Sequence, residues 1–123
     1  MHLSHREFHD LVRRAYDELP DEIMASIENV AILVEDWPAW EDLEDAGIER
    51  RDQLFGLYKG VPLPERGEFV PMLPDSITLF KRPIELVCAN WEDVVREVRT
   101  TLLHEVGHYM GFGEEDLEEM GYG

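Results

Sequence analysis

The stretch NWEDVVREVRTTLLHEVGHYMGFGE, residues 90–114, decides the fold. Asn90 is a good N-cap for a helix that begins at Trp91. Apolar residues then recur at spacings of three and four, at Val95, Val98, Leu102, Val106 and Tyr109. This spacing predicts a long amphipathic helix that reaches about Met110 and packs its apolar stripe against the core.

A second row on this predicted helix carries polar side chains, at Glu97, Thr101, His104 and His108. Residues four apart on a helix lie about 40° and about 6 Å apart, so the imidazoles of His104 and His108 can converge on one ion. Imidazole nitrogen suits Zn²⁺, which in catalytic sites usually has three protein ligands and a water. Glu105 lies one step round the helix, where it can reach that water. The spacing His-Glu-x-x-His therefore predicts two zinc ligands and a general base.

The third zinc ligand has to come from beyond the helix. Gly111 is placed to end the helix in a left-handed conformation, and Gly113 adds freedom to the turn. The chain can then present one of three acidic residues, Glu114, Glu115 or Asp116. Acidic residues here also suit the first turn of a last helix, EEDLEEM, so the spacing alone leaves the third ligand open.

Two other histidines provide an internal comparison. His5 and His9 are also four apart, but Arg6 stands where the motif has its glutamate, and no glycine turn with a carboxylate follows. We interpret this pair as solvated residues of a helix over residues 4–19, which begins with a capping-box pattern at Ser4 and Glu7.

The rest of the chain predicts an α+β fold. Three short stretches rich in apolar and β-branched residues predict strands: NVAILVED (29–36), LFGLYKG (54–60) and SITLFKRP (76–83). The first is expected to be buried, and Pro83 favours an edge position for the third. The polar stretch 37–52 predicts loose helical turns, and its acidic run EDLED (41–45) is interpreted as a solvated face.

Composition limits the function classes. A chain of 123 residues with 44% hydrophobic residues is expected to form a single domain, residues 1–123. Its formal net charge of −17 argues against nucleic acid and anionic membranes as partners. Cys88 is the one cysteine, which excludes an internal disulfide and a cysteine-based zinc site. The sequence shows no signal-peptide or membrane-spanning pattern, so we expect a cytoplasmic protein.

The segment HEVGHYMGFGE has the pattern H-E-x-x-H-x-x-G-x-x-E, which resembles the zinc-binding motif of metzincins with Glu114 in place of a third histidine. The chain resembles more closely the small bacterial zincin-like metallopeptidases called minimal zincins, over nearly its full length. This resemblance implies a minimal zincin-like fold. Such a fold has a small twisted mixed β-sheet, an N-terminal backing helix and a C-terminal active-site helix.

The resemblance also implies an activity and a cofactor. One Zn²⁺ per chain is expected to be held by His104, His108 and Glu114, and the substrate is expected to be a peptide or a protein. Zinc would activate a water molecule for peptide hydrolysis, with Glu105 as the general base. Tyr58, Tyr109 and Tyr122 are candidates for stabilising the oxyanion. We expect the substrate to pair with an exposed sheet edge, for which residues 76–83 are the candidate.

An alternative is a non-catalytic zincin scaffold that binds zinc and acts as a protein-interaction module. Glu105 argues against this alternative, because a purely structural zinc site needs no general base. The sequence predicts no oligomeric state.

Overall fold

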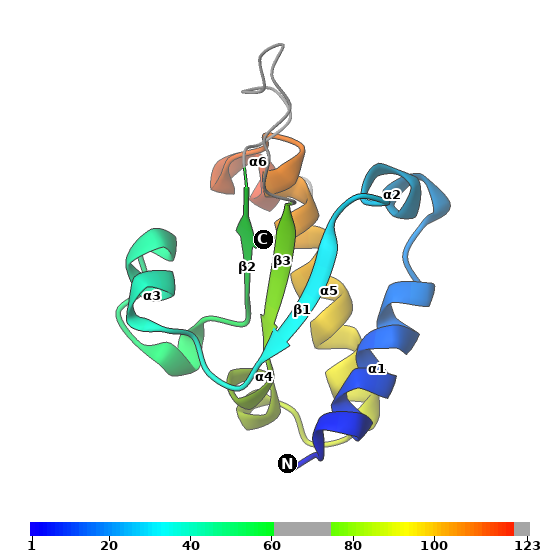
Figure 1. The fold of residues 1–123 in the computed structure, drawn as a ribbon, viewed down its shortest axis with the longest axis vertical. Helices are drawn as coiled ribbons and strands as arrows, with labels where there is room; N and C mark the ends of the chain where they lie inside the picture. The colour runs from blue at the N-terminus through cyan, green and yellow to red at the C-terminus, as the bar shows by residue number, and fades with distance from the viewer. Residues whose placement is uncertain (61–74, 120–123) are drawn as a thin grey trace.

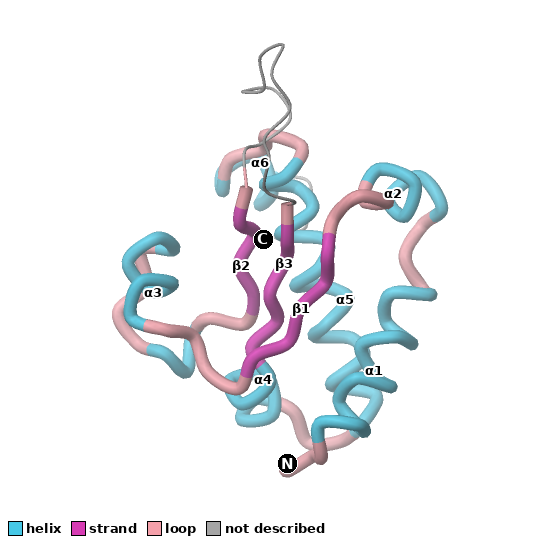
Figure 2. Tube along the Cα trace, viewed as in Figure 1, coloured by secondary structure: helices cyan, strands magenta, loops and turns pink. Residues whose placement is uncertain are grey.

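The computed structural model describes residues 1–60 and 75–119, without the side chains of Glu114 and Leu117. Its elements are, in chain order, α1 (His5–Asp17), α2 (Asp21–Ser26), β1 (Ala31–Glu35), α3 (Trp40–Ala46), the 3₁₀ helix η1 (Arg51–Gln53), β2 (Gly56–Lys59), β3 (Ser76–Phe80), α4 (Lys81–Val87), α5 (Trp91–Tyr109) and α6 (Glu114–Glu119). The strands form one mixed sheet in the order β1-β3-β2, with β1 parallel and β2 antiparallel to β3 (Figures 1 and 2). The predicted α+β class is confirmed.

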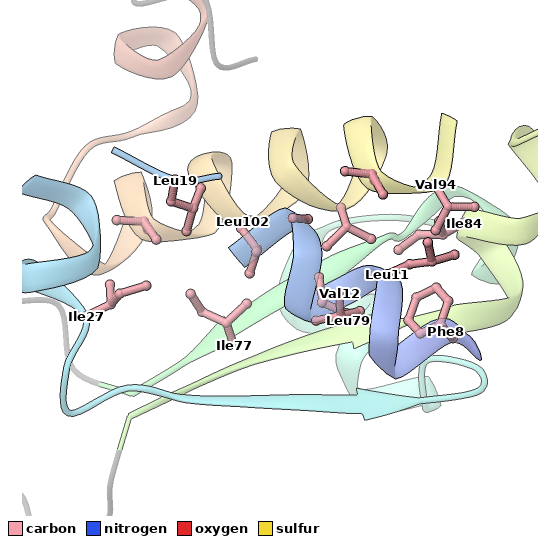
Figure 3. Close-up of a cluster of buried hydrophobic side chains, with 14 of the residues drawn as sticks. Phe8, Leu11, Val12, Leu19, Ile27, Ile77, Leu79, Ile84, Val94 and Leu102 are labelled. Atoms are coloured by element: carbon pink, nitrogen blue, oxygen red, sulfur yellow. The ribbon is translucent and has the colours of Figure 1, made fainter. Parts of the chain in front are cut away.

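Helices α1 and α5 lie side by side behind the sheet (Figure 1). The five residues of the predicted α5 stripe are all buried, and they pack with Phe8, Leu11, Val12 and Ala15 of α1 and with Ile77 and Leu79 of β3 (Figure 3). Both helices begin where the sequence predicts. The Ser4 and Glu7 side chains each accept a hydrogen bond from the other residue's backbone N–H, and Asn90 accepts one from the Asp93 N–H. These caps set where α1 and α5 begin, and the buried stripe of α5 packs this helix against the sheet.

The expected edge position of residues 76–83 is wrong. Strand β3 is the central strand, bonded to β1 on one side and to β2 on the other. Pro83 does not interrupt this pairing because it lies in the first turn of α4, where a backbone N–H has no partner within the helix. The described edges of the sheet are therefore β1 and β2.

Two further expectations need correction. Strand β1 is an edge strand with one face open to solvent, and its Leu33 side chain is exposed, so residues 29–36 do not form a buried strand. The short helix α2 follows Pro20, where the sequence predicted only the end of α1. Proline is well tolerated immediately before the first helical turn, so Pro20 separates two helices.

The acidic run at residues 41–45 is only partly solvated. Asp42 is buried, accepts a hydrogen bond from the Ala39 N–H and lies 2.8 Å from Lys59 Nζ. This carboxylate raises the pKa of Lys59 above its usual value. The ion pair ties α3 to the end of β2, beside a small apolar cluster of Leu43, Leu54 and Phe80.

Cys88 is buried in the main hydrophobic core. Burial raises its pKa to about 11, so the unreactive thiol form persists at neutral pH. Among the described helices, none combines the length and apolar character needed to span a bilayer.

Candidate metal centre

Helix α5 carries three possible metal ligands, His104, Glu105 and His108, whose ligand atoms lie close together. His104 Nε2 lies 3.2 Å from His108 Nε2 and 3.8 Å from Glu105 Oε2. One ligand atom from each residue lies within 4.8 Å of the others. Among the described residues, no other group of three histidine, cysteine, aspartate or glutamate side chains comes this close together. The convergence predicted for the His104 and His108 imidazoles is thus present in the fold.

The donor set and its spacing fit Zn²⁺. Two nitrogens that bind one tetrahedral Zn²⁺ at about 2.0–2.1 Å lie roughly 3.3 Å apart. The observed separation between His104 Nε2 and His108 Nε2 is 3.2 Å, so both rings can bind one ion with little rearrangement. The rings stand nearly perpendicular, at 76° to each other.

The C-terminal turn of α5 orients His108. Gly111 has φ 94°, in the left-handed region predicted for it. The Phe112 N–H bonds the Gly107 carbonyl and the Gly111 N–H bonds the His108 carbonyl, which together form a Schellman motif. This reversal places the Phe112 carbonyl 3.2 Å from His108 Nδ1. Since a carbonyl only accepts, Nδ1 carries the proton and the Nε2 lone pair faces the candidate metal position.

Glu105 is buried between α5 and β2, with 6% of its surface exposed. Its Oε1 accepts a hydrogen bond of 2.9 Å from the Tyr58 backbone N–H, and its Oε2 faces His104. The Phe55 carbonyl accepts a hydrogen bond from Phe80 of β3, so by alternation along β2 the backbone groups of Gly56 and Tyr58 point away from β3. The outer edge of β2 therefore orients the carboxylate.

The predicted third ligand, Glu114, begins α6, but its side chain lies outside the described part of the structure. The two substitutes, Glu115 and Asp116, are both exposed. Asp116 Oδ2 accepts a hydrogen bond of 3.1 Å from the Gly113 N–H and so caps α6. Neither substitute belongs to the group of ligand atoms formed by His104, Glu105 and His108.

The tyrosine candidates differ in their surroundings. The Tyr58 hydroxyl donates to Asp75 Oδ1 at 3.1 Å, and the ring packs edge-on against Tyr109 with centroids 5.6 Å apart. Tyr109 is buried in the core stripe, as its position predicted. Tyr122 lies outside the described residues.

The other histidine pair lies apart from this centre. His5 and His9 are exposed on α1, and His5 Nε2 is 3.6 Å from Asp36 Oδ1. The interpretation of this pair as solvated helix residues agrees with the structure.

A groove runs past the candidate centre. One cavity of about 640 Å³ lies between the outer edge of β2, the α3 segment and the C-terminal turn of α5. His104, Glu105 and His108 line this cavity. A second cavity of about 260 Å³ shares His104 and Glu105 with the first and extends towards the start of α5. The centre thus has open space on both sides.

Gly56 allows β2 to approach α5 closely. A Cβ atom at this position would lie 2.5 Å from Thr101 Cγ2 and 3.2 Å from the Thr78 carbonyl oxygen. A glycine inside a strand pattern is the sequence signal for such an approach, but Gly56 was not among the predicted site residues. The close approach is what brings the Tyr58 N–H to Glu105.

Replacing Gly56 with alanine is expected to destabilise the fold by about 1–3 kcal/mol, because the added methyl overlaps the Thr101 methyl. Urea unfolding measures the change. The second change Thr101→Ser removes the opposing methyl and should restore part of the loss, whereas Thr101→Ser alone should cost about 1 kcal/mol. If Gly56→Ala costs the same stability in the parent protein and in Thr101→Ser, the Thr101 methyl is not the cause of the loss.

Comparison with known proteins agrees with this architecture. A solved structure of a conserved hypothetical protein from T. thermophilus is 25% identical, with a TM-score of 0.53 and coverage of 96% of this chain and 97% of that chain. A search of curated protein sequences gives no significant match. The profile of the zincin-like metallopeptidase family matches residues 27–123, well over half of the sequence. The chain therefore belongs to the zincin-like metallopeptidase family.

Proposed function

We propose that the protein is a zinc-dependent peptidase. In this proposal His104, His108 and Glu114 hold one Zn²⁺ per chain, and Glu105 is the general base. The observation that carries it is the 3.2 Å separation of the two imidazole Nε2 atoms, with the Glu105 carboxylate facing them. Membership of the zincin-like metallopeptidase family supports zinc as the metal.

Each residue then has a distinct role. When bound, Zn²⁺ would supply Lewis acidity, which lowers the pKa of a water molecule to about 7 and polarises the scissile carbonyl. Glu105 takes a proton from the attacking water and delivers it to the leaving amine nitrogen. The Tyr58 N–H keeps the carboxylate directed at the reacting atoms, and the Phe112 carbonyl keeps His108 in the ligating tautomer.

The proposed substrate is an extended peptide that lies along β2. Among residues 1–60 and 75–119, this strand has a sheet partner on one side only, and its outer edge borders the groove. The Gly56 backbone groups on that edge suit pairing with an added strand, while the Tyr58 N–H is bonded to Glu105. Strand β2 takes the place of residues 76–83, which are central in the sheet.

The alternative of a non-catalytic scaffold explains less of this arrangement. Glu105 is buried and is oriented by a residue from another element. A zinc site that only stabilises the fold has no use for such a carboxylate beside its ligands. Peptide hydrolysis, in contrast, requires a general base at this position.

Zinc-loaded protein is expected to cleave an unfolded protein substrate, and mass spectrometry should detect the new termini. Cleavage should stop when a chelator is added and return with excess Zn²⁺. The His104→Ala variant, prepared in the same way, should be inactive. Cleavage by His104→Ala at the parent rate would instead indicate a contaminating protease and refute the proposal.

A further inference from the structure

Glu97 lines the second cavity, and the proposed reaction gives this residue no role. This cavity of about 260 Å³ continues the groove beyond His104 and Glu105, and its lining includes Ile48, Leu54 and Phe55. Glu97 precedes His104 by seven residues on α5, which corresponds to about 10 Å along the helix axis. The carboxylate thus stands within one long side chain's reach of the candidate centre.

The environment of Glu97 differs from that of other acidic residues on α5. Glu92 pairs with Arg14, and Asp93 contacts Arg96. Glu97, by contrast, is partly buried and forms no hydrogen bond or ion pair with another described residue. Burial, with no compensating charge, raises the pKa of its carboxyl.

The nearest arginines along α5 do not pair with the Glu97 carboxylate. Arg96 is engaged by Asp93, and Arg99 lies 3.9 Å from Glu18 of the α1 end. A partly desolvated carboxylate that the described chain leaves unpaired is stabilised by a cation from outside. The cavity is therefore complementary to a positively charged group.

The apolar part of the lining narrows the choice of cation. Ile48, Leu54 and Phe55 can contact methylene groups, while Glu97 meets a charge. Lysine and arginine side chains combine an aliphatic stem with a cationic head, which matches this division. A peptide N-terminal ammonium carries the same charge but no stem.

We propose that the cavity around Glu97 is a specificity subsite that binds the lysine or arginine side chain of a substrate near the bond to be cleaved. This inference rests on the proposed peptidase function. It adds a substrate class, peptides with a basic residue at one position relative to the scissile bond.

Peptide binding tests the subsite without requiring turnover. Zinc-loaded Glu105→Gln protein is titrated with N-acetylated peptides that carry lysine or uncharged norleucine at each position in turn, with fluorescence anisotropy as the readout. At one position the lysine peptide should bind about 10-fold more tightly than its norleucine partner. Adding Glu97→Gln should reduce this ratio to about 1. Adding Glu28→Gln, which removes the same charge at an exposed residue outside the cavity, should preserve the ratio.

Other outcomes overturn the subsite. These are a lysine preference that survives Glu97→Gln, no preference at any position, or no peptide binding. A further set of norleucine peptides with a free N-terminus tests the ammonium group. If only this set depends on Glu97, the side-chain assignment is wrong and the ammonium group is the ligand. Hydrolysis by the parent protein without selectivity refutes the subsite alone. Selective binding without hydrolysis refutes the peptidase proposal alone.

Discussion

Replacing Glu105 with glutamine is expected to lower kcat/KM for peptide hydrolysis by about 10²- to 10⁴-fold, the usual contribution of a general base. Glutamine keeps the size of the side chain and an oxygen that can accept the Tyr58 N–H bond. It cannot take a proton from the attacking water. Zinc content should stay at the parent level, because His104 and His108 are unchanged.

The matched control is Glu92→Gln, which removes a carboxylate from an exposed position on the same helix. This variant should keep the parent kcat/KM. Parent-level hydrolysis by Glu105→Gln would exclude Glu105 as the general base. Loss of zinc together with activity would instead make Glu105 a ligand, consistent with its 3.8 Å distance from His104 Nε2.

Replacing Glu85 with alanine is expected to cost about 3–5 kcal/mol of folding free energy. Glu85 Oε1 lies 3.1 Å from Lys81 Nζ, and both side chains are almost completely buried. Glu85 also accepts a hydrogen bond from the Leu3 backbone N–H. The change therefore leaves a buried ammonium and a buried amide without partners. Since small domains have a total stability of about 5–15 kcal/mol, urea denaturation should reveal a protein close to unfolding.

A double-mutant cycle separates the ion pair from simple packing loss. With Lys81→Met already in place, Glu85→Ala should cost much less, because no buried charge is left behind. The exposed control Glu28→Ala should change stability by less than about 0.5 kcal/mol. If Glu85→Ala costs the same in both backgrounds, the buried pair does not account for the loss.

The helical part of the site was predictable because it depends on local geometry. A helix of fixed pitch places residues four apart on one side, so the spacing of His104 and His108 predicts their convergence. The turn after α5 was equally local, since Gly111 takes the left-handed conformation that its position suggested. The interaction of His108 with the Phe112 carbonyl follows from this turn.

The contacts between distant segments were not predictable in the same way. Tyr58 precedes Glu105 by 47 residues, and only the packing of β2 on α5 joins them. The position of β3 depends likewise on which strands pair with it. Only Pro83 suggested an edge position for this strand, and that proline belongs to α4.

Charge patterns gave the least guidance. Asp42 stands in a run of acidic residues that a sequence predicts to be solvated, yet it is buried against Lys59. Burial of one carboxylate in such a run depends on a cation that tertiary structure supplies. Glu97 is the opposite case, a carboxylate on the polar row of α5 that the described fold leaves unpaired in a cavity.

The most direct test of the central claim is the metal content of protein purified without added metal, measured by elemental analysis. We predict about one zinc per chain, lost in His104→Ala and retained in His9→Ala, which removes a histidine from the exposed pair on α1. Absence of metal from the parent protein, even after Zn²⁺ is offered, would contradict the account. His104 and His108 would then be two neighbouring helix residues without a metal-binding role.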